Sequence, residues 1–210
     1  KELNAEEAKY IWGSQGNVWT EYIPNFKQVE YMIFPRMMAL SEVVWGTAEP
    51  AHYQEFQNRV VEHFKILDRL EINYSKAIFE VTGKALSSEN GKLKYQLSSA
   101  GKPENIRYTL NDTVPTISSN FYFQPIEISE NAILKAAYFE GNEIKSPLFT
   151  QSFEISKSTA RKITLENQPA ETYSTGGAFA LVDGIKGSQK NFGTSWLGFS
   201  GQDVVATIDL

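Results

Sequence analysis

The hydrophobic pattern of the chain changes its period near Ser75, and this change constrains the fold more than any other feature. Before Ser75, apolar residues recur every three or four positions, which is typical of helices with one buried face. After it, apolar and polar residues alternate, which is typical of half-buried antiparallel strands. The sequence therefore predicts a multi-part α+β protein in which helices precede a β-rich region.

Two helices are expected in the first region. Pro35 interrupts the first apolar stripe, and because proline lacks a backbone N–H, we expect a kink near Phe34. Trp45, at the end of this stripe, is expected to fill a core position. The first stripe comprises Val29, Met32, Ile33, Met37, Leu40 and Val44, and the second comprises Tyr53, Phe56, Val60, Phe64 and Leu67.

The alternating pattern after Ser75 predicts six or seven short strands over about 90 residues. This number of strands favours a β-sandwich of immunoglobulin or fibronectin-III type. The expected strands are 77–81, 93–97, 106–110, 125–128, 133–139 and 151–155, with turns at 88–91, 111–112 and 140–142. After residue 175 the chain becomes rich in Gly and Ser, and its last residues again suggest a strand.

Composition excludes several classes of function. The 20 Lys and Arg against 25 Asp and Glu give a net charge of −5, so nucleic acid is not an expected partner. The absence of cysteine excludes disulfides, thiolate metal sites and cysteine nucleophiles. No apolar run approaches the roughly 18 to 20 residues of a membrane span, and the first residues do not form a signal peptide. We therefore expect either a mature start at Lys1 or the removal of a preceding segment.

Residues 11–22 form the stretch that most suggests a binding site. On an extended strand, Trp19 and Glu21 would project to the same face. An indole packs against the C–H face of a pyranose, and a carboxylate accepts charge-assisted hydrogen bonds from neighbouring hydroxyls. A helix follows closely, which places both residues at the C-terminal end of a strand, where active sites of β/α barrels form. On spacing alone, a buried tryptophan beside a surface glutamate is the alternative. Placement of the two side chains on opposite sides, or inside a helix, would overturn the paired geometry.

The run over residues 13–22 and 29–45 resembles the last strand and last helix of the barrel in glycoside hydrolase family 20, the β-N-acetylhexosaminidases. In that family the positions matching Trp19 and Glu21 line the pocket for the non-reducing N-acetylhexosamine. The tryptophan stacks on the sugar ring, and the glutamate holds distal hydroxyls. The resemblance thus implies two partners, glycans ending in N-acetylhexosamine and the rest of a TIM (β/α)8 barrel, with no cofactor and a periplasmic, secreted or cell-surface location.

Two later segments extend this resemblance. Residues 106–116 and 133–139 resemble the β-sandwich called the chitobiase C-terminal domain, which follows the barrel in many bacterial members. Residues 180–185, 196–199 and 208–210 are similar to the opening of a discoidin-like (galactose-binding-like) domain. We therefore expect the end of a barrel at 1–73, a sandwich at 74–175 and a truncated discoidin-like piece at 176–210.

The resemblance also implies a mechanism. Family members cleave terminal β-linked N-acetylglucosamine or N-acetylgalactosamine by substrate-assisted catalysis. A glutamic acid protonates the glycosidic oxygen, while the adjacent aspartate orients the acetamido group of the substrate. Because the sequence contains no Asp-Glu dipeptide, we expect no catalytic residue in this chain and no activity from it alone. A non-catalytic carbohydrate-binding or spacer module is the alternative, and a spacer is the role expected of residues 75–175.

The charged residues of the helical region have simpler interpretations. His52 and His63 lie eleven positions apart without nearby carboxylates at ligand spacing, so we expect solvated or structural roles and no metal site. Arg36 is expected to form a structural ion pair with Glu30 or Glu42 rather than to hold substrate.

In the β-rich region, one cationic group is expected to form a solvated face that favours solubility; it comprises Lys92, Lys94, Lys102 and Arg107. Asp183 and Gly184 predict a plain turn. A calcium-binding turn is the alternative, because discoidin-like domains often hold a calcium ion nearby.

Overall fold

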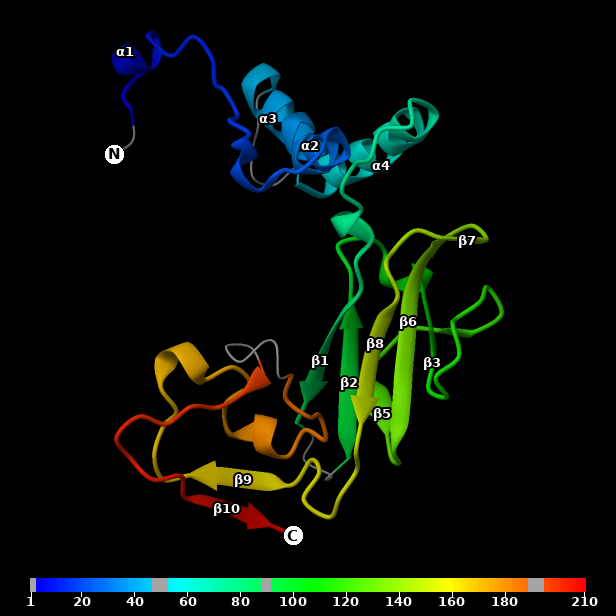
Figure 1. The fold of residues 1–210 in the computed structure, drawn as a ribbon, viewed down its shortest axis with the longest axis vertical. Coiled ribbons are helices and arrows are strands. Elements are labelled where there is room, and N and C mark those ends of the chain that lie inside the picture. The colour runs from blue at the N-terminus through cyan, green and yellow to red at the C-terminus, as the bar shows by residue number, and fades with distance from the viewer. Residues whose placement is uncertain (1–2, 47–52, 88–91, 189–194) are drawn as a thin grey trace. The chain divides into compact units, whose positions relative to one another are not determined.

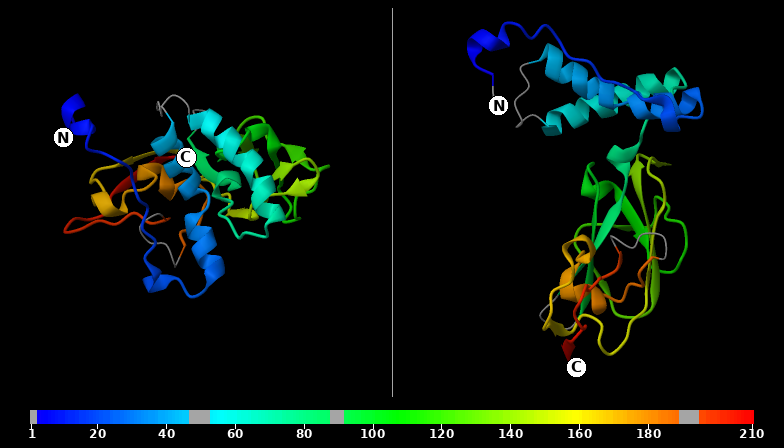
Figure 2. Two further views of the ribbon diagram at one scale, coloured as in Figure 1. Left: turned by 90° about the horizontal axis from the view of Figure 1, so that it is seen from above. Right: turned by 60° about the vertical axis from the view of Figure 1, so that its left-hand side comes forward.

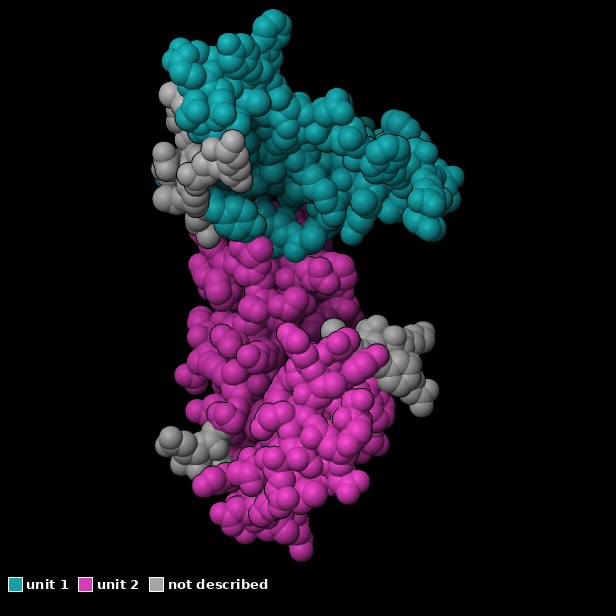
Figure 3. Space-filling view, turned by 90° about the vertical axis from the view of Figure 1, so that its left-hand side faces the viewer, with its two compact units in different colours: residues 1–78 teal, residues 79–210 magenta. Residues whose placement is uncertain are grey.

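The computed structural model describes residues 3–46, 53–87, 92–188 and 195–210. The chain divides into two compact units, Lys1–Ile78 and Phe79–Leu210, coloured teal and magenta in Figure 3. The three-part division at residues 73 and 175 stays a prediction. Within the described ranges, no helix combines the length and apolar character needed to cross a bilayer.

Unit 1 is helical (Figures 1 and 2). Its elements are α1 (Ala5–Ala8), the 3-10 helix η1 (Thr20–Tyr22), α2 (Phe26–Ile33), α3 (Arg36–Trp45) and α4 (Tyr53–Arg69). The predicted kink is instead a complete break between α2 and α3. Phe34 adopts an extended backbone with φ −99° and ψ 133°, because the ring of the following proline excludes the α conformation. The carbonyl of Phe34 accepts the N–H of Ser75 at 3.0 Å.

The buried side chains of unit 1 lie on α4 and just after it. Val60, Phe64 and Leu67 are buried, which confirms the last three positions of the predicted stripe, whereas Tyr53 at its start is 65% exposed, so the prediction is wrong there. The Phe64 ring stacks on Tyr74 with centroids 4.2 Å apart. This burial supplies the main apolar stabilisation of the unit.

The earlier part of unit 1 has a different surface. None of the described side chains between residues 3 and 46 is buried, so the prediction that the first apolar stripe is a buried helical face is wrong. Trp12 is 95% exposed and Trp45 is 90% exposed, so the prediction that Trp45 fills a core position is wrong. Trp45 is the last residue of α3, and the described residues leave its indole almost uncovered. Apolar exposure on this scale is unusual for a surface that faces only water.

Unit 2 contains antiparallel sheets (Figure 1). The first has the order β1-β2-β5, with β1 (Thr82–Leu86), β2 (Leu93–Ser98) and β5 (Ile126–Ile128). The second has the order β4-β3-β6, with β7 and β8 also paired to β6; these strands are β3 (Ile106–Thr109), β4 (Asn120–Phe121), β6 (Ala132–Glu140), β7 (Glu143–Ile144) and β8 (Phe149–Phe153). A two-stranded sheet joins β9 (Lys162–Leu165) to β10 (Ala206–Asp209). Among the described residues, the 3-10 helix η3 (Ala77–Phe79) spans the boundary between the units, and unit 2 also contains η4 (Pro103–Asn105), η5 (Glu171–Tyr173) and η6 (Gly177–Leu181).

The core of unit 2 lies between its two larger sheets. Leu93, Tyr95 and Leu97 are buried on β2, as their alternation predicts. Tyr95 meets Phe153 of β8 edge-to-face, with ring centroids 4.9 Å apart. Because these residues come from different sheets, the contact brings the sheets face to face. This arrangement is compatible with a β-sandwich.

The prediction of a strand at residues 77–81 is wrong, although the spacing of apolar residues in this segment is that of a strand. Residues 77–79 form η3, and the strand begins at Thr82. Phe79 and Val81 are both buried, so their spacing imitates that of a strand. The hydroxyl of Ser75 lies 3.4 Å from the backbone N of Ala77 and accepts its N–H, a local bond that favours a turn over sheet pairing.

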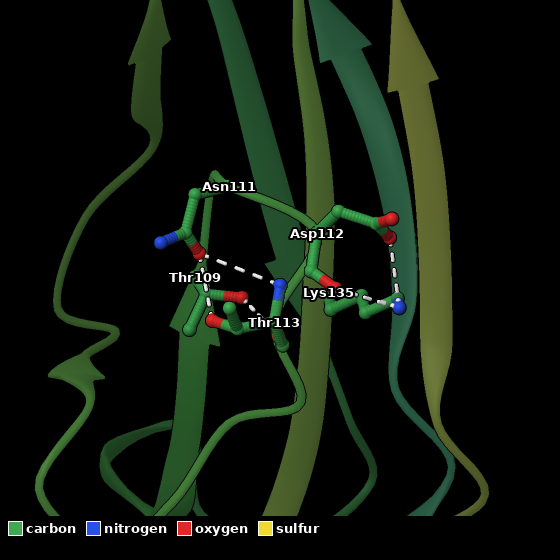
Figure 4. A network of polar contacts seen from close by, with 5 residues as sticks. All are labelled: Thr109, Asn111, Asp112, Thr113 and Lys135. Carbon is green, nitrogen blue, oxygen red and sulfur yellow. Dashed lines mark hydrogen bonds and ion pairs between the residues drawn. The ribbon is translucent and has the colours of Figure 1, made fainter.

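The turn predicted at residues 111–112 is confirmed and is held by the polar network in Figure 4. Asp112 has φ +64°, a left-handed conformation that aspartate tolerates. Lys135 of β6 contacts both the carboxylate and the carbonyl of Asp112, each at 2.8 Å. The Asn111 side chain accepts the Thr113 hydroxyl at 2.7 Å. These contacts fix the end of β3 against β6.

Candidate functional site

Trp19 and Glu21 lie where an extended segment enters a single 3-10 turn. Trp19 has φ −82° and ψ 124°, whereas Glu21 belongs to η1. The N–H of Ile23 closes this turn by donating to the carbonyl of Thr20 at 3.1 Å. The prediction of a strand through both residues is therefore wrong for the described chain, in which no segment pairs with residues 11–19 to complete a sheet. Trp19 and Glu21 were expected on one face because both were expected to be extended. Since Glu21 is helical, the two-residue spacing no longer indicates that the two side chains lie side by side.

The exposure of this segment argues against the alternative of a buried tryptophan beside a surface glutamate. Trp19 is 81% exposed, so it is not a buried structural tryptophan. Glu21 is also exposed, and Tyr22 beside it is 85% exposed. Both predicted site residues are thus free to contact a ligand or another protein surface. Their role as substrate-binding residues stays a prediction.

Contacts on both sides hold the segment in place. Before Trp19, the backbone of Gly16 lies against α3, where a Cβ added at Gly16 would be 3.5 Å from Leu40 Cδ2. After Glu21, the Asn25 side chain caps α2 by accepting the N–H of Gln28 at 3.0 Å. The segment before the turn therefore runs beside α3, and the turn leads within a few residues into the capped start of α2.

Arg36 does not form the predicted ion pair. Its guanidinium donates to the carbonyls of Tyr31 and Met32, at 3.2 and 3.0 Å. These are orphan carbonyls in the last turn of α2, where a cation is also favoured by the helix dipole. Of its two expected partners, Glu42 pairs with Arg59, while Glu30 accepts the N–H of Asn73 at 3.0 Å.

The histidines give no positive indication of a metal centre. His63 is exposed on α4 and lines a groove of about 510 Å³ with Glu42, Arg59 and Trp45. His52 lies outside the described residues. Within the described ranges, no three His, Cys, Asp or Glu side chains are grouped closely enough to hold a metal ion. The assignment of both histidines to solvated or structural roles stays a prediction.

Arg107 was predicted on a solvated face, and that prediction is wrong. The side chain is 7% exposed, and its Cζ lies 3.5 Å from the centroid of the Phe121 ring. Its Nη1 donates to the carbonyl of Glu104 at 2.8 Å. Burial lowers the pKa of the guanidinium. The alternation of β3 suggested an outward-facing arginine, but the aromatic ring of β4 covers it. Lys92, by contrast, forms an exposed ion pair with Glu127 at 2.7 Å.

Asp183 and Gly184 form a turn. The Asp183 carboxylate accepts the N–H of Ile185 at 2.8 Å, and Gly184 has φ +71°. Burial raises the pKa of Asp183 to about 6. The residue also lines a cleft of about 900 Å³ in unit 2 that contains Tyr95 and Gln151. The calcium-binding alternative stays a prediction.

Sequence reasoning missed one aromatic surface. Phe121 and Phe123 stack with ring centroids 5.7 Å apart and planes inclined by 14°. They are 48% and 77% exposed, and the intervening Tyr122 is buried. The signal was the alternation of three aromatic residues, which on an extended backbone places the first and third on one face.

Comparison with known proteins identifies two parts of the chain. Residues 1–48 match the family model described as "Glycosyl hydrolase family 20, catalytic domain", and residues 95–153 match the model described as "Fn3 associated". The second match covers most of β2 and all of β3 to β8, and it leaves β1 outside. The resemblance to family 20 predicted from the sequence is confirmed.

Similar proteins carry related names. A "Beta-hexosaminidase" of Porphyromonas gingivalis is 28% identical over 173 residues, which cover 80% of this chain and 20% of that protein. An "N,N'-diacetylchitobiase" of Vibrio harveyi is 24% identical over 119 residues, 55% of this chain and 14% of that protein. A "Beta-N-acetylhexosaminidase" of Cellulomonas fimi is 31% identical over 60 residues, 29% of this chain and 12% of that protein. The chain thus spans about a fifth or less of the length of these relatives.

Proposed function

We propose that this chain is part of an exo-acting β-N-acetylhexosaminidase that hydrolyses terminal β-linked N-acetylglucosamine or N-acetylgalactosamine. The observation that carries the proposal is the match of residues 1–48 to the family 20 catalytic domain, because this range contains both Trp19 and Glu21. The names of the relatives support the same activity.

In this proposal, Trp19 and Glu21 form one wall of the pocket for the terminal amino sugar. The exposed indole packs on the C–H face of the sugar ring, and the Glu21 carboxylate accepts hydrogen bonds from its hydroxyls. These contacts orient the ring so that its own acetamido group can attack the anomeric carbon. Both residues therefore bind and orient substrate, and neither transfers a proton.

The bond-breaking groups come from the rest of the barrel. Substrate-assisted cleavage needs an acid for the glycosidic oxygen and a carboxylate that orients the acetamido group, and the adjacent Asp-Glu pair that supplies them in the family does not occur in this sequence. The exposed apolar side chains of residues 3–46 support contact with such a partner. Packing against the remaining strands would also give residues 11–19 the hydrogen-bond partners of a barrel strand.

The other parts of the chain are assigned accessory roles. We assign the sheets of unit 2 to an immunoglobulin- or fibronectin-III-like sandwich, supported by the match at residues 95–153. Residues 176–210 are assigned to a discoidin-like piece on their sequence resemblance. The location proposed for the enzyme is periplasmic, secreted or at the cell surface, where terminal glycans are accessible.

The experiment uses the protein that carries this chain together with the remaining barrel. Trp19→Ala should lower kcat/KM for a nitrophenyl N-acetyl-β-glucosaminide by about tenfold, because a stacking contact to the sugar is lost. The matched control is Trp45→Ala, a tryptophan of similar exposure, 90% against 81%, outside the predicted pocket. Equal losses in the two variants would contradict the role of Trp19. Turnover by the 210-residue chain alone, at rates comparable to those of the complete enzyme, would overturn the proposal that the catalytic pair lies elsewhere.

A further inference from the structure

Unit 2 presents a fixed aromatic pair to the solvent. Tyr122 is 5% exposed, and its hydroxyl accepts the backbone N–H of Leu97 at 3.1 Å. Because successive side chains of an extended segment point to opposite sides, the inward anchor at Tyr122 directs Phe121 and Phe123 outward. Phe123, at 77% exposure, is among the most exposed aromatic side chains described in this unit.

The pair is supported from inside the unit. The Arg107 guanidinium packs on the Phe121 ring at 3.5 Å, and Phe121 in turn stacks on Phe123. Arg107 is itself held by its hydrogen bond to the Glu104 carbonyl at 2.8 Å. Rings that are already held in place lose little conformational entropy when a ligand binds.

Polar groups share a groove with these rings. The groove has a volume of about 440 Å³ and is lined by both phenylalanines together with Tyr108, Lys94, Gln124 and Glu127. Lys94 and Glu127 are opposite each other in the β2–β5 register, and Glu127 is held by Lys92 at 2.7 Å. The groove thus combines apolar ring faces with an ammonium donor, an amide and a carboxylate acceptor. Its size is typical of sites for small ligands.

We propose that this groove is a glycan-binding site of unit 2, separate from the sugar pocket assigned to unit 1 and in place of the spacer role that the sequence suggested for residues 75–175. The aromatic faces would receive the C–H faces of one or two pyranose rings, and the polar side chains would bond their hydroxyl and acetamido groups. The mixture favours a glycan over a protein partner, because the centre of a protein interface is depleted in charged side chains. A linear oligomer of β-linked N-acetylglucosamine is the expected ligand, and this choice rests on the proposed function.

The test is calorimetric titration of the full 210-residue chain with chitotetraose. Phe123→Ala should weaken the Kd by about tenfold, and Phe123→Trp should retain binding because it keeps an aromatic face. The matched control is Phe26→Ala in unit 1, which removes a phenylalanine of similar exposure, 73% against 77%. This control should leave the Kd unchanged. If Phe123→Ala does not fold, Gln124→Ala provides the second variant and should also weaken binding.

A further variant separates this proposal from the proposed function. Trp19→Ala should leave chitotetraose binding at the unit 2 groove intact, even where the same change impairs hydrolysis by the complete enzyme. The glycan proposal is overturned by the absence of saturable binding, by equal affinity of the wild type and Phe123→Ala, or by loss of binding in Trp19→Ala alone. Sedimentation tests whether a second copy of the chain occupies the groove instead. If Phe123→Ala changes self-association while sugar affinity stays the same, the glycan proposal is overturned.

Discussion

Removal of one hydroxyl tests how the aromatic surface of unit 2 is held. The Tyr122 hydroxyl accepts the buried N–H of Leu97 at 3.1 Å. The pairing of β2 with β5 ends at Tyr95 and Ile126. Beyond this pair, β5 offers no acceptor to the Leu97 N–H, and the Tyr122 hydroxyl takes its place. Tyr122→Phe leaves this donor unpaired. A buried unpaired backbone donor costs about 1–3 kcal/mol, and for a unit of this size that corresponds to a fall in Tm of about 4 °C per kcal/mol.

Two measurements check this expectation. Urea unfolding followed by circular dichroism in the β region gives the loss of stability of the unit. Native-state hydrogen exchange gives the local effect, because the Leu97 amide should exchange faster in Tyr122→Phe than in the wild type. The local readout also separates the lost hydrogen bond from a general loss of packing.

The matched control is Tyr108→Phe, which removes the same atom from a half-buried tyrosine on β3. This change should alter stability by no more than about 0.5 kcal/mol. Equal stability of the wild type and Tyr122→Phe, or unchanged protection of the Leu97 amide, would refute the reasoning that this hydroxyl completes the sheet and directs the neighbouring phenylalanines outward.

Two further changes test the half-buried carboxylate of Asp183 and the buried guanidinium of Arg107 in unit 2. Because burial raises the pKa of Asp183 to about 6, the folded state binds a proton more tightly than the unfolded state, and the wild type loses stability as pH rises through that value. Asp183→Asn should therefore be more stable than the wild type at pH 8 by about 1–2 kcal/mol, after allowance for partial exposure, with no difference below about pH 4. Urea unfolding at several pH values checks this, with the exposed Asp203→Asn as control, and a constant difference would contradict it. Arg107→Lys should destabilise the unit by about 2 kcal/mol in thermal unfolding, because lysine cannot reproduce the planar contact with Phe121 or the forked donors; a change below about 0.5 kcal/mol would show that any cation suffices.

The sequence predicted elements whose signals are local and repeated. The buried stripe of α4 and the alternation of β2 both extend over enough residues to fix which face lies inside. The turn at residues 111–112 was also predictable, because asparagine and aspartate bond to the nearby backbone. By contrast, β9 is only four residues long, and its partner β10 follows about forty residues later. Such a pairing depends on chain topology and leaves little trace in the local pattern.

For the candidate site, the sequence determined the residue types and their family resemblance. The backbone around Glu21 was decided by tertiary structure, because a strand forms only where a neighbouring chain accepts and donates its hydrogen bonds. The same reason explains Arg107, whose position on an alternating strand suggested solvent until the ring of Phe121 covered it. Alternation identifies the apolar face of a strand, but only long-range packing decides whether the opposite face is covered as well, as on β3, where both Ile106 and Arg107 are buried.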